Sequence, residues 1–152
     1  MIRVRVSGVD PVVRSYNRKK AGIEDALTDG TNEAADYLIE CIEEKFGTYQ
    51  PGWAPLKYET IVKERRMGYG ANASSPLVMT ADMMFSFYKQ TSARTRKHTV
   101  WVLSDDPKLK FHMYGAPGAR VPKRDPVRPT VKEENDKCLD IIRDAVRRAL
   151  RL

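Results

Sequence analysis

The chain has little of the chemistry that enzymes and metalloproteins use. It contains only two histidines and two cysteines in 152 residues, whereas a structural zinc site needs about four such ligands. His98, His112, Cys41 and Cys138 are spread along the chain, and no CxxC, HExxH or GxSxG motif occurs. We therefore expect no catalytic residues, no metal and no cofactor, and we expect both thiols to be reduced and buried.

A long apolar run is also missing. No stretch approaches the roughly 20 apolar residues that cross a bilayer. The opening residues, MIRVRVSGVD, alternate apolar with basic side chains and lack the apolar core of a secretory signal. We therefore expect no membrane segment, and we expect the protein to stay where it is made. The length and the 41% hydrophobic content favour a single domain over residues 1–152.

Acidic residues are outnumbered, and the two signs of charge are unevenly distributed. The net charge of +7 permits contact with a polyanion but does not demonstrate it. Basic residues gather in three regions: Arg94, Arg96, Lys97, Arg120, Lys123, Arg124, Arg128, Arg143, Arg147, Arg148 and Arg151. Acidic residues gather in the first third: Glu24, Asp25, Glu33, Glu40, Glu43 and Glu44. Such a molecule is suited to head-to-tail contact with copies of itself.

The sequence predicts two long helices and a short one. Apolar residues recur at helical spacing over residues 11–46: Tyr16, Ile23, Leu27, Ala34, Leu38, Ile42 and Phe46. Gly30 lies on or beside this stripe, where its missing side chain could let another backbone come close. A second long helix runs to the C-terminus from a capping box of Thr130 and Glu133. A short helix is expected over residues 57–66.

Strands are predicted on either side of the polar stretch TSARTRKH. Residues 2–6 alternate apolar and basic side chains, and residues 85–91, 99–104 and 109–114 form an antiparallel meander. Residues 99–104 are apolar on both faces, which favours a central strand. The expected fold class is α+β, with an antiparallel β-sheet packed on one face by the long N-terminal helix and the C-terminal helix. A mobile loop is expected over residues 67–76.

The stretch PLVMTADMMFSF, residues 76–87, is rich in methionine and phenylalanine. A core element has this composition, and so does a contact surface that adapts to a partner. We expect Thr80 to cap a helical turn and Met83 to lie in the core. Met84 or Phe85 is expected to face a neighbouring subunit, although the alternative that all these side chains are core stays open.

The proline-rich segment 116–129 is predicted to be an arm between subunits. Its prolines restrict its conformations, so ordering it against a neighbour costs less entropy. The candidate interface residues, in the arm and on the surfaces it would meet, are Arg120, Pro122, Lys123, Arg124, Arg128, Met84, Glu40 and Glu44. We expect Arg124→Glu to weaken association while the monomer still folds. The alternative is an exposed loop that only connects a strand to a helix.

A basic hairpin tip is the second candidate site. Arg94, Arg96 and Lys97 could follow a phosphate backbone, as residues that line a DNA channel would. No aromatic residues alternate with them, which argues against a stacking platform for single strands. The alternatives are a solvated tip and contact with an acidic neighbour.

The order of the motifs resembles one family. WAPLKYETIVKER is followed by a glycine-containing loop, PLVMTADMMFSF, FHMYG and VPKRDPVRPT before the last helix. This order resembles the phage virion-morphogenesis and tail-completion family, the small head–tail joining proteins of tailed phages. The matching residues are Trp53, Pro55, Leu56, Thr60, Lys63, Pro76, Leu77, Thr80, Ser86, Gly115, Pro122 and Arg124. The family usually has glycine at the place of Ala81, which indicates that the turn here does not need a positive φ.

The resemblance implies a structural role without catalysis. Such proteins are small α+β subunits that assemble as rings, often six-fold, at the head-proximal end of the tail, around a channel for DNA. It implies a homo-oligomer that contacts the tail terminator or tail tube and the head connector, in the neck of the virion after assembly in the host cytoplasm. Non-specific contact with passing DNA is also implied. The alternative function is a DNA-binding accessory protein that uses the basic tip.

Overall fold

The computed structural model describes residues 9–78, 81–92 and 98–150. Three predicted features lie outside these residues: the strand over residues 2–6, the Thr80 cap and the basic tip of Arg94, Arg96 and Lys97.

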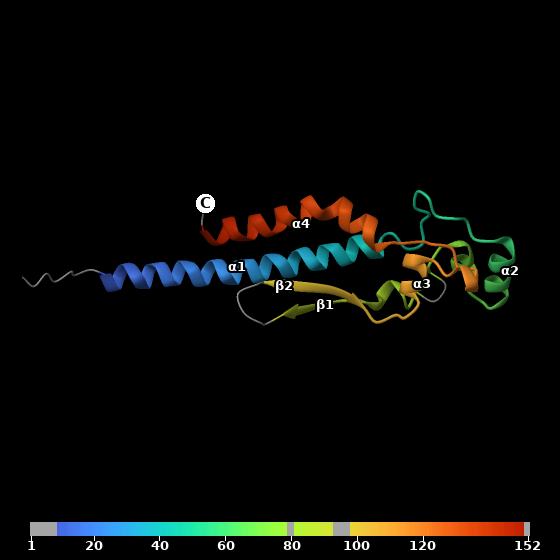
Figure 1. The fold of residues 1–152 in the computed structure, drawn as a ribbon, viewed down its shortest axis with the longest axis horizontal. Helices are drawn as coiled ribbons and strands as arrows, with labels where there is room; N and C mark the ends of the chain where they lie inside the picture. Colours follow the sequence, from blue (N-terminus) through green and yellow to red (C-terminus); the bar gives the residue numbers. More distant parts are fainter. Residues whose placement is uncertain (1–8, 79–80, 93–97, 151–152) are drawn as a thin grey trace, which may run out of the picture.

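A long central helix organises the described part of the chain. Helix α1, Val9–Glu43, has helix α4, Val127–Leu150, packed antiparallel along one side and a β-hairpin along the other (Figure 1). Strands β1, Phe87–Ser92, and β2, Thr99–Ser104, pair antiparallel from Phe87 opposite Ser104 to Ser92 opposite Thr99. The α+β class with two long helices and an antiparallel sheet is therefore confirmed, but within the described residues the sheet has two strands and is no meander.

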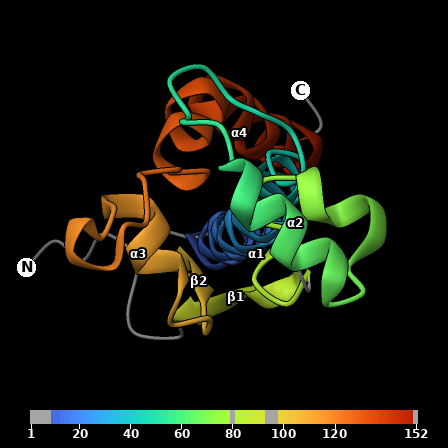
Figure 2. The same cartoon turned by 90° about the vertical axis from the view of Figure 1, so that its right-hand side faces the viewer.

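Short elements gather at one end of this layered body (Figure 2). They are α2, Tyr58–Arg66; α3, Leu109–Tyr114; and the 3-10 helices η1, Gly70–Ser74, η2, Met84–Ser86, and η3, Pro117–Ala119. We call this end the cap, residues 48–78, 81–86 and 105–126. The predicted helix over residues 57–66 corresponds to α2.

The core lies where α1 meets the cap. Ile42, Phe46, Met83 and Leu109 are buried together, and the ring of Phe46 meets that of Phe87 edge-on at 6.0 Å between centroids. Met83 therefore lies in the core as predicted.

The two neighbouring residues of the methionine-rich stretch divide between core and surface. Met84 is half-buried and packs against the core, whereas Phe85 is 67% exposed. Of the two candidates for a neighbour-facing side chain, Phe85 is the accessible one.

Residues 109–114 form helix α3, and the predicted third strand is wrong. Leu109 and Met113 belong to an alternating pattern, but they are also four positions apart, which is a helical spacing. Both side chains contact the core from one face of the helix. Asp106 stabilises the turn that precedes this helix, because its Oδ1 accepts a hydrogen bond from the Lys108 backbone N–H at 2.7 Å. His112, expected on the outward face of a strand, is turned into the cap.

Helix α4 begins at Val127, earlier than the predicted capping box. The Asp125 carboxylate accepts hydrogen bonds from the backbone N–H groups of Val127 and Arg128 at 3.0 and 3.1 Å, which is the geometry of an N-cap followed by proline. Thr130 is buried inside the helix and its hydroxyl donates to the Pro126 carbonyl at 2.7 Å. The Asp-Pro pair was the stronger start signal, and the capping-box prediction was wrong.

One turn differs from expectation in backbone conformation. The segment 67–76, where a mobile loop is predicted, contains η1, and Ala73 and Pro76 within it are fully buried. Ala81 has φ of +62°, so the turn does adopt the left-handed conformation that the missing glycine seemed to exclude. An alanine in that region is strained by roughly 1 kcal/mol relative to glycine.

Small residues let α1 and α4 approach closely. Ala34 and Ala145 are buried between the helices, and a Cβ placed on Gly30 would lie 2.9 Å from the Ala145 Cβ and 3.1 Å from the Ile142 Cα. Gly30 therefore provides the close approach that the sequence suggested.

Gly30→Ala should lower the free energy of unfolding by about 1–3 kcal/mol, because the overpacking against the α4 backbone exceeds the ~1 kcal/mol gain in helix propensity. Gly22→Ala is the matched control, since nothing lies within 4 Å of its Cβ, and it should stabilise the protein slightly. Urea unfolding followed by circular dichroism measures both. Equal stabilisation by the two substitutions would contradict the close packing.

Candidate functional site

A cleft with a volume of about 730 Å³ lies in the cap. The turn before α2, α2 itself, α3 and the proline-rich segment form its walls. Its charged and histidine side chains are mostly basic: Lys57, Glu64, Lys108, His112, Arg120, Lys123 and Arg124. The remaining lining is largely apolar, with Leu56, Leu77 and Met83 among its residues.

Arg124 joins two walls of this cleft. Its side chain is 5% exposed, and its guanidinium donates to the Ala54 carbonyl at 2.8 and 3.0 Å and to the Pro55 carbonyl at 3.3 Å. Its backbone N–H donates to the His112 carbonyl at 2.8 Å. Burial lowers the pKa of this guanidinium from its very high usual value, while Tyr49 and Glu64 oppose the shift. The arginine clasps the turn before α2 to the segment after α3.

The proline-rich segment is folded onto the protein rather than extended as an arm. Pro126 is fully buried, Asp125 is buried, and Ala116 and Val121 form an antiparallel bridge. Because Arg124 is buried and bonded to its own chain, its side chain is not presented to a neighbour. The expectation that Arg124→Glu leaves the monomer folded does not fit this environment, since a buried carboxylate would face backbone carbonyls.

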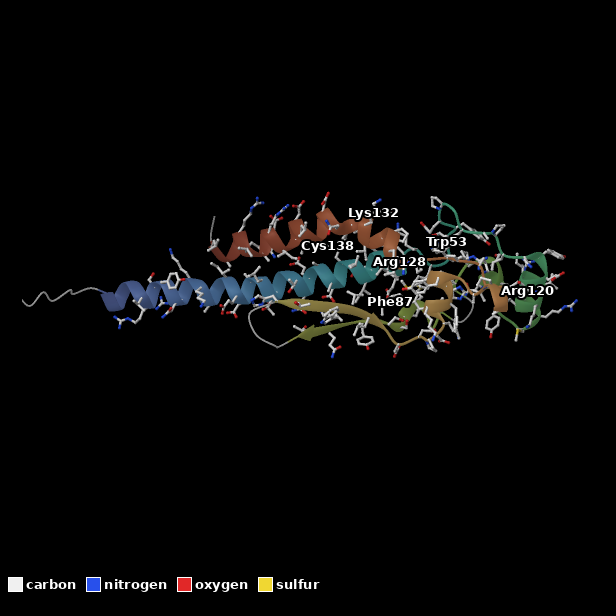
Figure 3. All side chains as sticks on the ribbon, viewed as in Figure 1. Trp53, Phe87, Arg120, Arg128, Lys132 and Cys138 are labelled. Carbon is white, nitrogen blue, oxygen red and sulfur yellow. The ribbon has the colours of Figure 1, made fainter. Side chains whose placement is uncertain are left out.

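The other predicted interface residues of this segment are more accessible but dispersed. Arg120 lies at the far end of the cap and Arg128 at the start of α4 (Figure 3). Arg128 lies over the Tyr114 ring, 4.4 Å from its centroid, and forms an ion pair with Asp125. Lys123 is exposed and Pro122 half-buried. The structure does not bring Arg120 and Arg128 together into one surface.

The predicted acidic partners Glu40 and Glu44 are exposed near the end of α1. Nearby acidic residues are already paired within the chain: Glu33 with Arg148 at 3.2 Å, and Asp36 with Lys89. Their role as contacts between subunits stays a prediction.

Two titratable groups beside Arg124 respond to burial. Burial raises the pKa of the Glu64 carboxyl, and the positive charge of Arg124 opposes this shift. Burial, with a further contribution from Arg124, lowers the pKa of His112, whose Nδ1 is enclosed without a hydrogen-bond partner. The cleft thus contains converging polar groups, but the enclosed Nδ1 and the occupied guanidinium fit a structural cluster better than an acid–base pair.

The two cysteines lie at the interface of the long helices. Both are free and half-buried, and Cys138 lies on α4 with its Sγ 3.8 Å from the Ala34 carbonyl oxygen (Figure 3). Burial, together with Cys41 and Glu134, raises the pKa of the Cys138 thiol, which makes it a weak nucleophile. Within the described ranges, no group of three or more histidine, cysteine or acidic residues could hold a metal ion.

The outer face of the hairpin is a surface that the sequence interpretation missed. Val102 packs on the core from the inner face of β2, whereas Trp101 is 56% exposed and Tyr88 on β1 is 46% exposed. Tyr88 lies opposite Leu103 and Trp101 opposite Gln90, so the two aromatic residues are diagonal neighbours. The apolar character of both faces, taken as evidence of a central strand, instead belongs to a strand with one face left open.

Comparison with known proteins places the chain in no family: no family model, no curated protein and no solved structure matches it. As for a membrane span, none of the helices in the described segments combines the length and the apolar character that crossing requires.

Arg124→Met should lower the free energy of unfolding by about 2–4 kcal/mol, because the charged hydrogen bonds to two carbonyls are lost. Lys123→Met is the control: Lys123 is the exposed neighbour, and the change should stay within about 0.5 kcal/mol. Thermal and urea unfolding of both variants measure this. Equal stability of the two would show that the clasp contributes nothing.

The lowered pKa of His112 makes stability depend on pH. Because the folded state binds this proton less readily than the unfolded state, the stability contributed by neutral His112 is present above about pH 6.5 and is lost as the pH falls toward the folded pKa. Between about pH 7 and about pH 5, His112→Gln should lose less unfolding free energy than the unsubstituted protein. The unfolding free energy of both proteins is measured by urea unfolding at each pH. An equal loss in the two proteins between these pH values would contradict this prediction.

Proposed function

We propose that this protein is a structural subunit of a phage neck, a tail-completion or head–tail joining protein that assembles as a ring and performs no catalysis. The observation that carries the proposal is the open outer face of the hairpin. Exposed aromatic residues on a two-stranded sheet are typical of a protein–protein interface rather than of an isolated monomer's surface. Trp101 and Tyr88 are residue types that contribute strongly to such contacts.

The motif order supports the same proposal independently. Several residues that carry the resemblance contribute to the folded structure here. Arg124 bonds two segments of the cap together, Pro76 is fully buried, and Gly115 has a φ of +78°. The backbone at Ala81 also has the conformation that the family's usual glycine adopts readily. The proposed partners are other copies of this chain, the tail terminator or tail tube, and the head connector.

Self-assembly through the hairpin can be measured directly. Light scattering after size exclusion and negative-stain imaging should find a ring, and Trp101→Ser should weaken association ~10-fold or more. Tyr58→Ser is the control, because Tyr58 is 80% exposed on α2, remote from the hairpin. A monomer at every concentration, or normal maturation of virions that lack the protein, would refute the proposal.

DNA binding is the second candidate function. In the described residues it is favoured by Arg14, Arg18, Lys19 and Lys20, which are all exposed on the first part of α1. Duplex binding with a steep dependence on salt would support this alternative, whereas a ring around a channel should bind free DNA weakly at physiological salt.

A further inference from the structure

The first part of α1 has no neighbour among the described residues. Helix α1 extends beyond the end of α4 and beyond the hairpin (Figure 1). Residues 13–21 are all exposed, with Val13 at 47% and Tyr16 at 66%, and a Cβ on Gly22 would meet nothing within 4 Å. From Val9 to Gly22 this projection is about 20 Å long at the rise of an α-helix. A helix of this length is marginal in water unless it is extended from a packed helix or covered by a partner.

The charges on α1 change sign along its length. Residues 13–20 contain four basic side chains and no acidic one, whereas residues 21–44 contain eight acidic side chains and no lysine or arginine. The division coincides with the structure, because the basic part is the uncovered projection and most of the acidic part packs against α4 and the hairpin.

Most of these charges also lie on one face. Steps of three, four or seven connect Arg14, Arg18, Asp25, Asp29, Glu33, Asp36, Glu40 and Glu44, and such steps keep residues on one side of a helix. All eight side chains are exposed. We call this face the α1 stripe; it is positive at its beginning and negative afterwards.

The acidic part of the stripe is only partly neutralised. Arg148 pairs with Glu33 and Lys89 with Asp36. No ion pair within the described residues involves Asp25, Asp29, Glu40 or Glu44, nor Arg14 or Arg18. Each molecule therefore has both an unpaired positive patch and an unpaired negative patch, at different places on one exposed face.

We propose that the basic projection of α1 in one copy docks against the acidic part of the α1 stripe in another copy. The two patches differ, so the contact is heterologous and can repeat around a ring. This inference rests on the proposed assembly role and names its contact. The complementary charges set the register of the two helices and speed the encounter between copies. The aromatic face of the hairpin contributes apolar area to the contact.

Charge reversal at each patch, and mixing of the two variants, tests the contact. Arg14→Glu with Arg18→Glu makes the stripe wholly negative, and Glu40→Lys with Glu44→Lys makes its far end positive. Both exchanges replace one good helix former with another, so the helix should persist. Each variant alone should self-associate ~10-fold or more weakly than the unsubstituted protein, and an equimolar mixture should regain association. Sedimentation velocity measures all three samples.

The matched control is Lys132→Glu with Lys137→Glu, which changes the net charge as the first variant does, at exposed positions of α4. It should associate as the unsubstituted protein does. Association of the unsubstituted protein should also weaken as salt rises from about 0.05 to about 0.5 M, where charges are screened within a few ångströms.

Three results would overturn the inference. The charge-reversed variants could associate normally; they could both fail to associate even when mixed; or the first variant could lose only binding to duplex DNA or to anionic vesicles, with its association unchanged. An unsubstituted protein that stays monomeric at every concentration would instead refute the proposed assembly function itself.

Discussion

The close antiparallel contact between α1 and α4 determines how the long elements of this protein are arranged. Gly30, Ala34 and Ala145 bring the two backbones together, and this places α1 between α4 and the hairpin. Polar contacts then fix the register: the Tyr37 hydroxyl donates to Glu134 at 2.6 Å and Lys45 pairs with Glu133 at 2.8 Å. Exposed pairs of this kind contribute little free energy, so the packing of small residues is the principal stabilising term.

The cap, at the far end of the molecule, is held together by side-chain hydrogen bonds rather than by helix packing. The cap has few long elements, and its segments are joined by single side chains: Arg124 bonds to the turn before α2, and Asp125 caps α4. Of these two adjacent residues, Arg124 therefore links two segments within the cap through backbone carbonyls. Asp125 links the cap to the N-terminus of α4.

The sequence predicted the elements that have strong local signals. The periodicity of residues 11–46, the role of Gly30 and strand 99–104 could all be read without a structure. The third strand could not, because Leu109 and Met113 satisfy both an alternating and a helical spacing, and only contact with the core distinguishes them. The start of α4 was misplaced because two competing signals, Thr130 with Glu133 and Asp125 with Pro126, lie within one short stretch.

The candidate site was harder to predict, because exposure is a property of the fold. The proline-rich segment suggested that Arg124 contacts a neighbouring subunit, whereas its hydrogen bonds to residues 54 and 55 depend on a contact that is distant in sequence. Trp101 was expected in a central strand, and its exposure follows from the absence of a third strand beside it among the described residues. The uncovered first part of α1 was likewise invisible, since its apolar stripe continues that of the buried part.

We propose that this protein functions by presenting shape and charge to other copies of itself. Sedimentation velocity of the purified protein over a wide concentration range tests this proposal. We expect a reversible shift from the mass of one chain to a single closed multiple of it, with the midpoint moving to higher concentration as salt is added. One species with the mass of a single chain at every concentration and salt would contradict it.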